Sequence, residues 1–185
     1  MKKFLLTILL LLVPLSTACA YPGETEGFGL LRWGMSVSDV KHLYHLYHDA
    51  VPVKEINPDF ADTVWVVTIP DPHGEMGIDS EVSAACYFSD NRLTIIQLPI
   101  DGDTEDIDTI RSRQLNRMIS LYGIPDIEDE QGFTIWEGVV TSIYLSHGIV
   151  MKDNKSAFFI TLLDMQNCIK NPRENKDKEA LVREG

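Results

Sequence analysis

The sequence has few cysteines and little positive charge, and each shortage argues against a class of function. Only three cysteines occur in 185 residues, and the two that follow the N-terminal segment have no histidine nearby, which argues against a zinc site. Lysine and arginine number 16 against 28 aspartate and glutamate residues, so the formal net charge is −12. That balance would repel the phosphates of nucleic acid and of anionic lipid, whereas it is compatible with a basic protein partner.

The chain also lacks the local motifs of common catalytic and nucleotide-binding sites. It contains no Walker loop, no Rossmann glycine pattern and no G-x-S-x-G sequence. Ser146 and His147 are adjacent and do not form a catalytic triad on their own. The acidic segment 101–108 fails the EF-hand test, because Asp106 stands at position six and Ser112 at position twelve. We therefore expect no enzyme and no cofactor.

The first twenty residues have the layout of a bacterial secretory signal. Lys2 and Lys3 are followed by a nearly apolar run, 4–15, and then by small residues. This run is too short for a spanning helix, and no later apolar run is long enough to cross a bilayer. We therefore expect export to the periplasm. Without the signal, 14 basic and 28 acidic side chains remain, a charge of about −14.

Two alternatives stay open for the processing of this signal. Ala18 and Ala20 match an A-x-A cleavage site, which would make Tyr21 the first residue of a soluble protein. Alternatively, residues 15–19 resemble a lipobox, in which Cys19 would be acylated and would anchor the chain to the outer membrane.

Two cysteines remain in either mature form. Cys86 and Cys168 lie in or beside predicted strands, and an even number of cysteines in an oxidising compartment predicts a disulfide between them. Such a bond would join the first half of the chain to the last strand. The alternative is two separate buried thiols, because the sequence does not show that the two Cα atoms come close together.

Hydrophobic periodicity predicts a helix and a group of strands, and then the same order again. Ser36 is placed to cap a helix over 37–47, and Gly123 is placed to end a helix over 105–122 in the left-handed conformation. A very short connection at Asp90-Asn91 predicts a hairpin. The predicted strands cover 62–69, 81–89, 92–98, 133–136, 139–146 and 157–163.

This order predicts an α+β fold of two tandem helix-plus-three-strand units, in which an antiparallel sheet has its helices packed on one face. The predicted organisation is a signal peptide (1–20), a lead-in (21–27), a single domain (28–168) of two pseudo-repeats (28–100 and 101–168), and a charged tail (169–185).

Three segments resemble motifs of small exported bacterial proteins and lipoproteins. They are 28–40 (FGLLRWGMSVSDV), 87–93 (YFSDNRL) and 121–125 (LYGIP). In architecture the chain resembles the outer-membrane assembly lipoprotein family BamE, also called SmpA, and β-lactamase inhibitory protein. The resemblance implies a protein-binding fold without catalysis, and it implies no particular partner.

Two groups of residues are candidate sites. His42 and His45 lie one turn apart on the predicted helix and could share a divalent metal, although the zinc helix spacing of four with a glutamate is absent. The Pro- and Gly-containing loop 70–80 is the candidate partner-contacting segment, because loops on a rigid sheet often carry contacts. Its candidate partner-binding residues are Asp71, His73, Glu75 and Met76.

We therefore expect an exported, non-catalytic protein-binding or scaffolding protein of the bacterial envelope, either an inhibitor or an assembly factor. Its expected partner is another envelope or secreted protein, with no nucleic acid and no transmembrane span in the mature chain. Contact with the membrane is expected only through a lipid on Cys19. The alternative is a divalent-metal-binding or hydrolytic periplasmic protein that uses the His42/His45 helix face.

Overall fold

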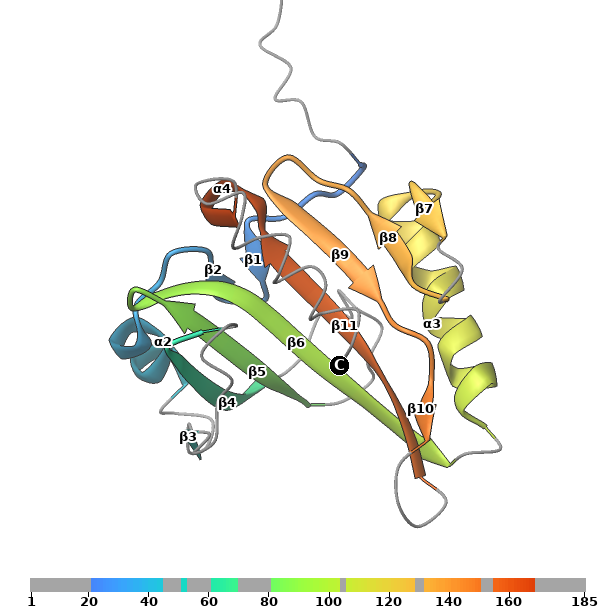
Figure 1. Cartoon of the computed structure of the whole chain (residues 1–185), viewed down its shortest axis with the longest axis horizontal. Coiled ribbons are helices and arrows are strands. Elements are labelled where there is room, and N and C mark those ends of the chain that lie inside the picture. The colour runs from blue at the N-terminus through green and yellow to red at the C-terminus, as the bar shows by residue number, and fades with distance from the viewer. Residues whose placement is uncertain are drawn as a thin grey trace, which may run out of the picture.

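Strands dominate the part of the chain that the structure describes. The computed structural model describes residues 21–44, 51–52, 61–69, 81–103, 106–128, 132–150 and 155–168. Within these ranges the chain forms a two-stranded hairpin, a nine-stranded sheet and three helices (Figure 1). None of the helices in this part of the chain is long and apolar enough to span a bilayer.

The large sheet is antiparallel throughout and runs without interruption from one half of the chain to the other. At its centre, β6 (Arg92–Asp103) pairs with β11 (Lys155–Asp164), from Lys155 opposite Asp103 to Leu163 opposite Ile95. From β6 the sheet continues through β5 (Val82–Ser89) and β4 (Thr63–Ile69) to β3 (Val51–Pro52). From β11 it continues through β9 (Thr141–Leu145) and β8 (Thr134–Trp136) to β7 (Ile127–Glu128), and β10 (Ile149–Val150) also pairs with β11.

The predicted α+β fold of two helix-plus-three-strand units is therefore wrong. The structure is mostly β, and the long β6–β11 pair joins both halves into one sheet. The strand predicted over 92–98 continues to Asp103 in the structure, although Pro99, Gly102 and the two aspartates have low strand propensity. Pairing with β11 overrides that propensity, and Lys155 lies opposite Asp103. The two-residue strands β3, β7 and β10 also escaped the sequence pattern.

The first helix, α2 (Val37–Tyr44), begins where the sequence predicts and has the predicted cap. The Ser36 hydroxyl accepts a hydrogen bond from the Asp39 amide (3.1 Å), and the Asp39 carboxylate accepts one from the Ser36 amide (2.9 Å). This reciprocal pair is a capping box. It holds the pKa of Asp39 below the ordinary value, because the Ser36 hydroxyl and amide both donate to the ionised carboxylate.

The second helix, α3 (Ile107–Tyr122), also matches the prediction closely. It ends at Gly123, whose φ of +84° is positive as expected but whose ψ of −168° lies outside the left-handed helical region. Arg111 fixes the helix to the sheet, because its guanidinium donates to the carbonyl oxygens of Ser146 (2.8 Å) and Gly132 (2.8 Å). Burial lowers the pKa of Arg111.

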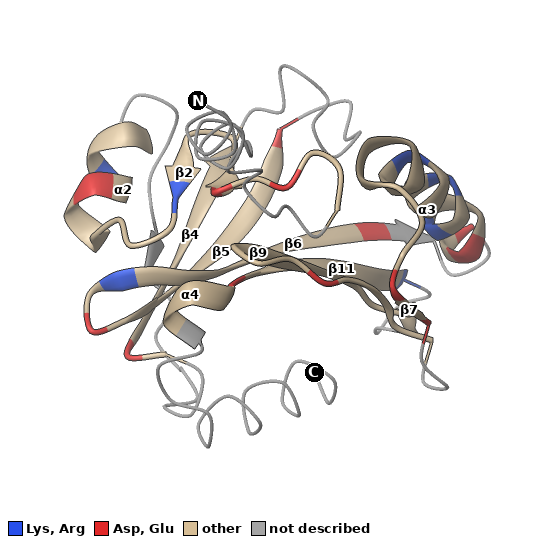
Figure 2. Ribbon diagram, turned by 90° about the horizontal axis from the view of Figure 1, so that it is seen from above, with Lys and Arg blue, Asp and Glu red and all other residues tan. Residues whose placement is uncertain are grey.

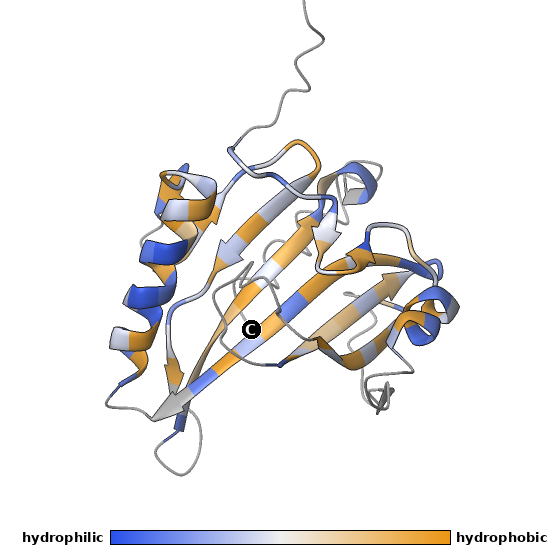
Figure 3. Ribbon diagram, turned by 180° about the vertical axis from the view of Figure 1, so that it is seen from behind, coloured by the Kyte–Doolittle hydropathy of each residue, from blue (hydrophilic) through white to orange (hydrophobic). Residues whose placement is uncertain are grey.

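Helices α2 and α3 cover one face of the sheet, whereas the short α4 (Met165–Cys168) lies on the other (Figure 2). The main core fills the space between the sheet and the first two helices, with Tyr44, Met118 and Trp136 among its buried side chains. A smaller cluster on the opposite face includes Tyr144 and Leu163, and Met165 of α4 packs against it. Apolar residues follow the strands along the length of the sheet (Figure 3).

Cys86 is a free thiol inside the main core, not one half of the predicted disulfide. Its side chain has no exposed surface, and burial raises its pKa to about 12. The backbone of Cys168 lies in α4, on the face of the sheet opposite that core, and its side chain lies outside the described residues. The bond to Cys168 is therefore not formed here. The alternative of separate thiols agrees with the state of Cys86.

Candidate binding pocket

The segment that enters the domain, residues 21–26, is held firmly against β9. Tyr21 is 3% exposed, its ring packs edge-on against Tyr122 at 5.7 Å between centroids, and its hydroxyl donates to the Thr141 carbonyl oxygen (2.6 Å). One Glu24 carboxylate oxygen accepts from the amides of Val140 (2.6 Å) and Thr141 (3.0 Å). The predicted lead-in is therefore an integral part of the fold.

Gly138 makes room for this contact. A Cβ atom at Gly138 would lie 1.9 Å from the Thr141 carbonyl oxygen and 2.4 Å from the bonded oxygen of Glu24. Any side chain there would overlap the Thr141 backbone, which has no free rotation to avoid it, and would also displace the Glu24 carboxylate. The turn between β8 and β9 thus needs glycine at this position because of close approach, and not because of backbone torsion.

The side chain of Thr141 joins the entering segment to the first hairpin, β1 (Gly27–Phe28) and β2 (Leu31–Arg32). Thr141 is fully buried, and its hydroxyl accepts from the Trp33 indole N–H at 2.7 Å. The same hydroxyl donates a short hydrogen bond to the carbonyl oxygen of Thr25. One hydroxyl group therefore fixes both ends of the hairpin and sets the orientation of the Trp33 ring.

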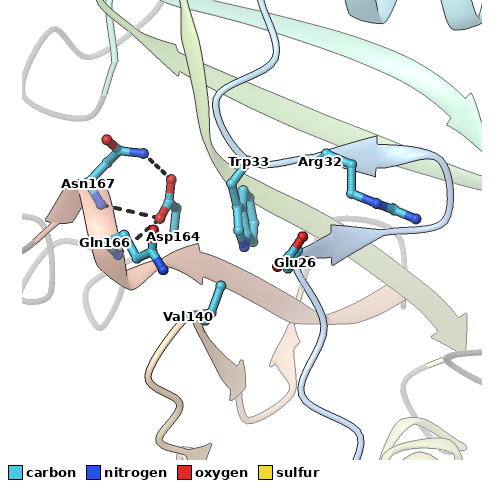
Figure 4. Close-up of a pocket in the computed structure, with 7 residues that line it drawn as sticks. All are labelled: Glu26, Arg32, Trp33, Val140, Asp164, Gln166 and Asn167. Carbon is cyan, nitrogen blue, oxygen red and sulfur yellow. Dashed lines mark hydrogen bonds between the residues drawn. The ribbon is translucent and has the colours of Figure 1, made fainter. Parts of the chain in front are cut away.

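A pocket of about 230 Å³ opens beside Trp33 (Figure 4). The hairpin supplies one wall, the turn before β9 supplies a second, and the end of β11 with α4 supplies a third. The lining residues are Glu26, Arg32, Trp33, Val140, Asp164, Gln166 and Asn167.

The one basic residue among the pocket-lining residues is directed elsewhere. A single guanidinium nitrogen of Arg32 donates to the carbonyl oxygens of Gly29 (2.6 Å) and Leu31 (2.7 Å), both in its own hairpin. Figure 4 shows the Arg32 side chain extending away from Trp33. These bonds hold the Arg32 guanidinium at the hairpin turn, so it does not extend toward the Trp33 side of the pocket.

The opposite wall contains a buried carboxylate. Asp164 is 1% exposed, and one of its oxygens accepts from the amides of Gln166 (3.0 Å) and Asn167 (3.2 Å). The other oxygen accepts a short bond from the Asn167 side-chain amide. These bonds start α4 and hold the carboxylate in place. With Glu26, the pocket combines two carboxylates, two side-chain amides and an indole face, a set that suits a cation or a hydrogen-bond donor.

The adjacent Ser146 and His147 do not form a nucleophile and base. The Ser146 hydroxyl donates to the His147 carbonyl oxygen (3.0 Å) and accepts from the Phe159 amide (2.8 Å). The His147 ring packs edge-on against Phe133 at 5.7 Å between centroids. Both side chains thus serve the packing of the sheet.

Most candidate residues from the sequence fall outside the described ranges. Of the histidine pair, His42 is exposed on α2, and His45 lies outside the described residues. No group of three or more metal-binding side chains occurs in the described part of the chain. The metal hypothesis stays untested, as do the candidates in the undescribed segments, which are Cys19, Asp71, His73, Glu75 and Met76.

The pocket itself was not predicted, because its walls come from three distant segments. Residues 26–33, 140 and 164–167 are joined only by the sheet. One local signal was present: Asp164, at the end of an apolar strand and three residues before Asn167, is a good helix N-cap.

Comparison of the chain with protein-family models, with curated protein sequences and with solved structures returns no match. The resemblance to BamE and to β-lactamase inhibitory protein therefore stays a prediction.

Proposed function

We propose that this chain is an exported, non-catalytic binding protein of the bacterial envelope, and that it holds a basic partner protein through one lysine or arginine side chain in the pocket beside Trp33. The observation that carries the proposal is the chemistry of that pocket. An indole face lies between the carboxylates of Glu26 and Asp164, while Arg32 is bonded to its own hairpin.

Pocket size supports a single side chain as the ligand. Sites for drug-sized molecules and cofactors enclose roughly 300–1,000 Å³. The space beside Trp33 is about 230 Å³ and opens to the surface, which suits the end of a lysine or arginine chain. Such a cation would gain from the indole ring by about 0.5–2 kcal/mol, depending on how far it is desolvated.

The charge of the whole chain supports a basic partner. The charge of about −14 that remains without the signal raises the rate at which a basic protein meets this one and disfavours acidic competitors. A binding role without catalysis is further supported because the polar groups near the pocket make structural hydrogen bonds. Asp164 starts α4 and Thr141 holds the hairpin, so both serve to keep the pocket rigid.

A matched pair of charge-neutralising variants tests the proposal. Glu26→Gln changes a pocket carboxylate, whereas Glu81→Gln removes the same charge at an exposed position next to β5. Each immobilised protein is incubated with an envelope extract, and bound proteins are quantified by mass spectrometry with and without prior acetylation of the extract's lysines.

We expect a protein that the wild type and Glu81→Gln retain equally and that Glu26→Gln retains several-fold less. Competition with N-acetyl-lysine amide, but not with N-acetyl-norleucine amide, should release it. Equal retention by the two variants, or equal competition by the two amides, would contradict the role of the pocket.

A further inference from the structure

Exposed apolar side chains gather where α3 ends. Ile124 is 84% exposed, Leu121 is 40% exposed and Ile127 is 38% exposed, all within seven residues of sequence. Pro22 is also exposed and lies against Gly123, since a Cβ atom built on that glycine would be 3.4 Å from the proline ring. We call Pro22, Leu121, Ile124 and Ile127 the α3-exit surface. Large aliphatic side chains exposed together mark contact surfaces more often than isolated ones do.

The α3-exit surface adjoins the point where the N-terminal segment enters the fold. The aromatic pair Tyr21–Tyr122 and the bond from the Tyr21 hydroxyl to Thr141 fix Tyr21 beside the end of α3. In Figure 1 the start of the described chain, the end of α3 and the turn between β8 and β9 lie along the same edge of the molecule. That turn carries another exposed aliphatic residue, Val139, which is 50% exposed.

The lipobox cysteine precedes this fixed point by only two residues. Two residues of extended chain reach at most roughly 7 Å. An acyl group on Cys19 would therefore be tied closely to Tyr21, with no long linker to separate the bilayer from the domain. Under that constraint, the side chains around Tyr21 are the ones nearest to the membrane.

The charge of α3 differs from that of the chain as a whole. The helix contains Arg111, Arg113 and Arg117 but only one acidic residue, Asp108. Arg113 and Arg117 are exposed and precede Leu121 at four-residue intervals, so the three share one side of the helix. At a bilayer surface, these arginines could contact the phosphate headgroups while the apolar side chains beyond them reach the acyl chains.

We propose that the α3-exit surface lies against the lipid bilayer when the chain is anchored through acylated Cys19. Ile124, at the centre of the surface, enters the boundary between headgroups and acyl chains, and the exposed Arg113 and Arg117 contact phosphate groups. This inference does not depend on the pocket beside Trp33. Arg113 and Arg117 offset part of the repulsion expected from the acidic chain, whereas the exposed Asp126 and Glu128 flank Ile127 within the surface itself.

An environment-sensitive fluorophore tests the orientation. Protein with its natural mature N-terminus carries NBD on Ile124→Cys or, as a control, on Thr109→Cys, an exposed site roughly 18 Å before Leu121 along α3. Both carry Cys168→Ser, and the buried Cys86 is not labelled in the folded protein. Emission is recorded with and without vesicles of phosphatidylcholine and phosphatidylethanolamine.

On vesicles we expect a blue shift and a several-fold brightening at position 124, with little change at position 109. Three results would overturn the proposal. They are no change at position 124, equal changes at both positions, and an intact mass that shows an unacylated Tyr21 as the first residue. A change at position 124 with a purified envelope protein but not with vesicles would assign the surface to a protein instead.

Discussion

The hydroxyl of Thr141 makes two hydrogen bonds that hold the hairpin beside the pocket, so Thr141→Val should have a large effect for its size. Valine has nearly the same volume as threonine, and the change leaves no cavity. It does remove the acceptor of the Trp33 indole N–H and the donor to the Thr25 carbonyl oxygen. At about 1 kcal/mol of net stability for each bond, we expect the free energy of unfolding to fall by about 2 kcal/mol.

Urea denaturation followed by circular dichroism measures this loss. With a slope of about 2 kcal/mol per molar urea, the midpoint should fall by about 1 M while the slope stays unchanged. The matched control is Thr161→Val. Thr161 is also buried in the sheet, but among the described residues its hydroxyl accepts a single weak bond, from the Gln97 side-chain amide at 3.5 Å.

The two variants should also differ at the pocket. Loss of the indole bond frees the Trp33 ring, and retention of the basic partner should fall in Thr141→Val but not in Thr161→Val. Equal midpoints for the two variants would refute the reasoning, because the hydroxyl would then contribute no more than an ordinary buried threonine.

Three further changes probe other parts of the argument. Gly138→Ala should lower the free energy of unfolding by about 3 kcal/mol, because its Cβ atom would overlap the Thr141 carbonyl group and displace Glu24. Gly148→Ala meets only the side chain of Ile107 and should cost less than about 1 kcal/mol; similar losses in the two variants would contradict the close approach at Gly138. Cys86, with a pKa of about 12, should not react with iodoacetamide at pH 8 in the native protein. In urea it should react without any reductant. If the reaction in urea needed a reductant, the prediction of a disulfide would be restored. The pKa of Asp39 is lowered in the folded state, so its contribution to stability is present above its ordinary value of 3.8 and is lost as the pH falls through the lower folded value. In Ser36→Ala the pKa of Asp39, followed by NMR, should return toward that ordinary value, and an unchanged pKa would rule out the Ser36 hydroxyl as its main cause.

Local signals predicted the elements whose determinants are close in sequence. The capping box at Ser36 starts α2 as expected, and the two-residue connection at Asp90-Asn91 forms the predicted hairpin with positive φ at both residues. The strand predicted over 62–69 is observed over Thr63–Ile69. In each case a short stretch of sequence contains the cause of the structure.

Elements that depend on distant partners were not predicted. Residues 99–103 form a strand only because β11 pairs with them, and strands of two residues are too short to show any periodicity. The pocket has the same origin. Glu26 and Asp164 lie more than 100 residues apart in the sequence, so no spacing rule could have placed them in one site.

The short connection between Cys19 and the fixed Tyr21 leads to a last prediction about the anchored form. Ten Gly/Ser residues inserted between Ala20 and Tyr21 would add an average span of roughly 16–19 Å between the acyl group and the domain. If the short connection presses the α3-exit surface against the bilayer, the insertion should return the NBD emission at position 124 toward its value in water.

Retention of the basic partner by the pocket should be unchanged in the insertion variant, because Tyr21, Glu24 and Thr141 keep their contacts. Bright emission at position 124 despite the insertion would show that the short connection is not what places the α3-exit surface on the bilayer, because the surface would then bind the bilayer by its own affinity. If the insertion abolished both the retention of the partner and the bright emission, the pocket beside Trp33 and the α3-exit surface would not be independent sites. The insertion therefore separates what the anchor does for orientation from what the hairpin does for binding.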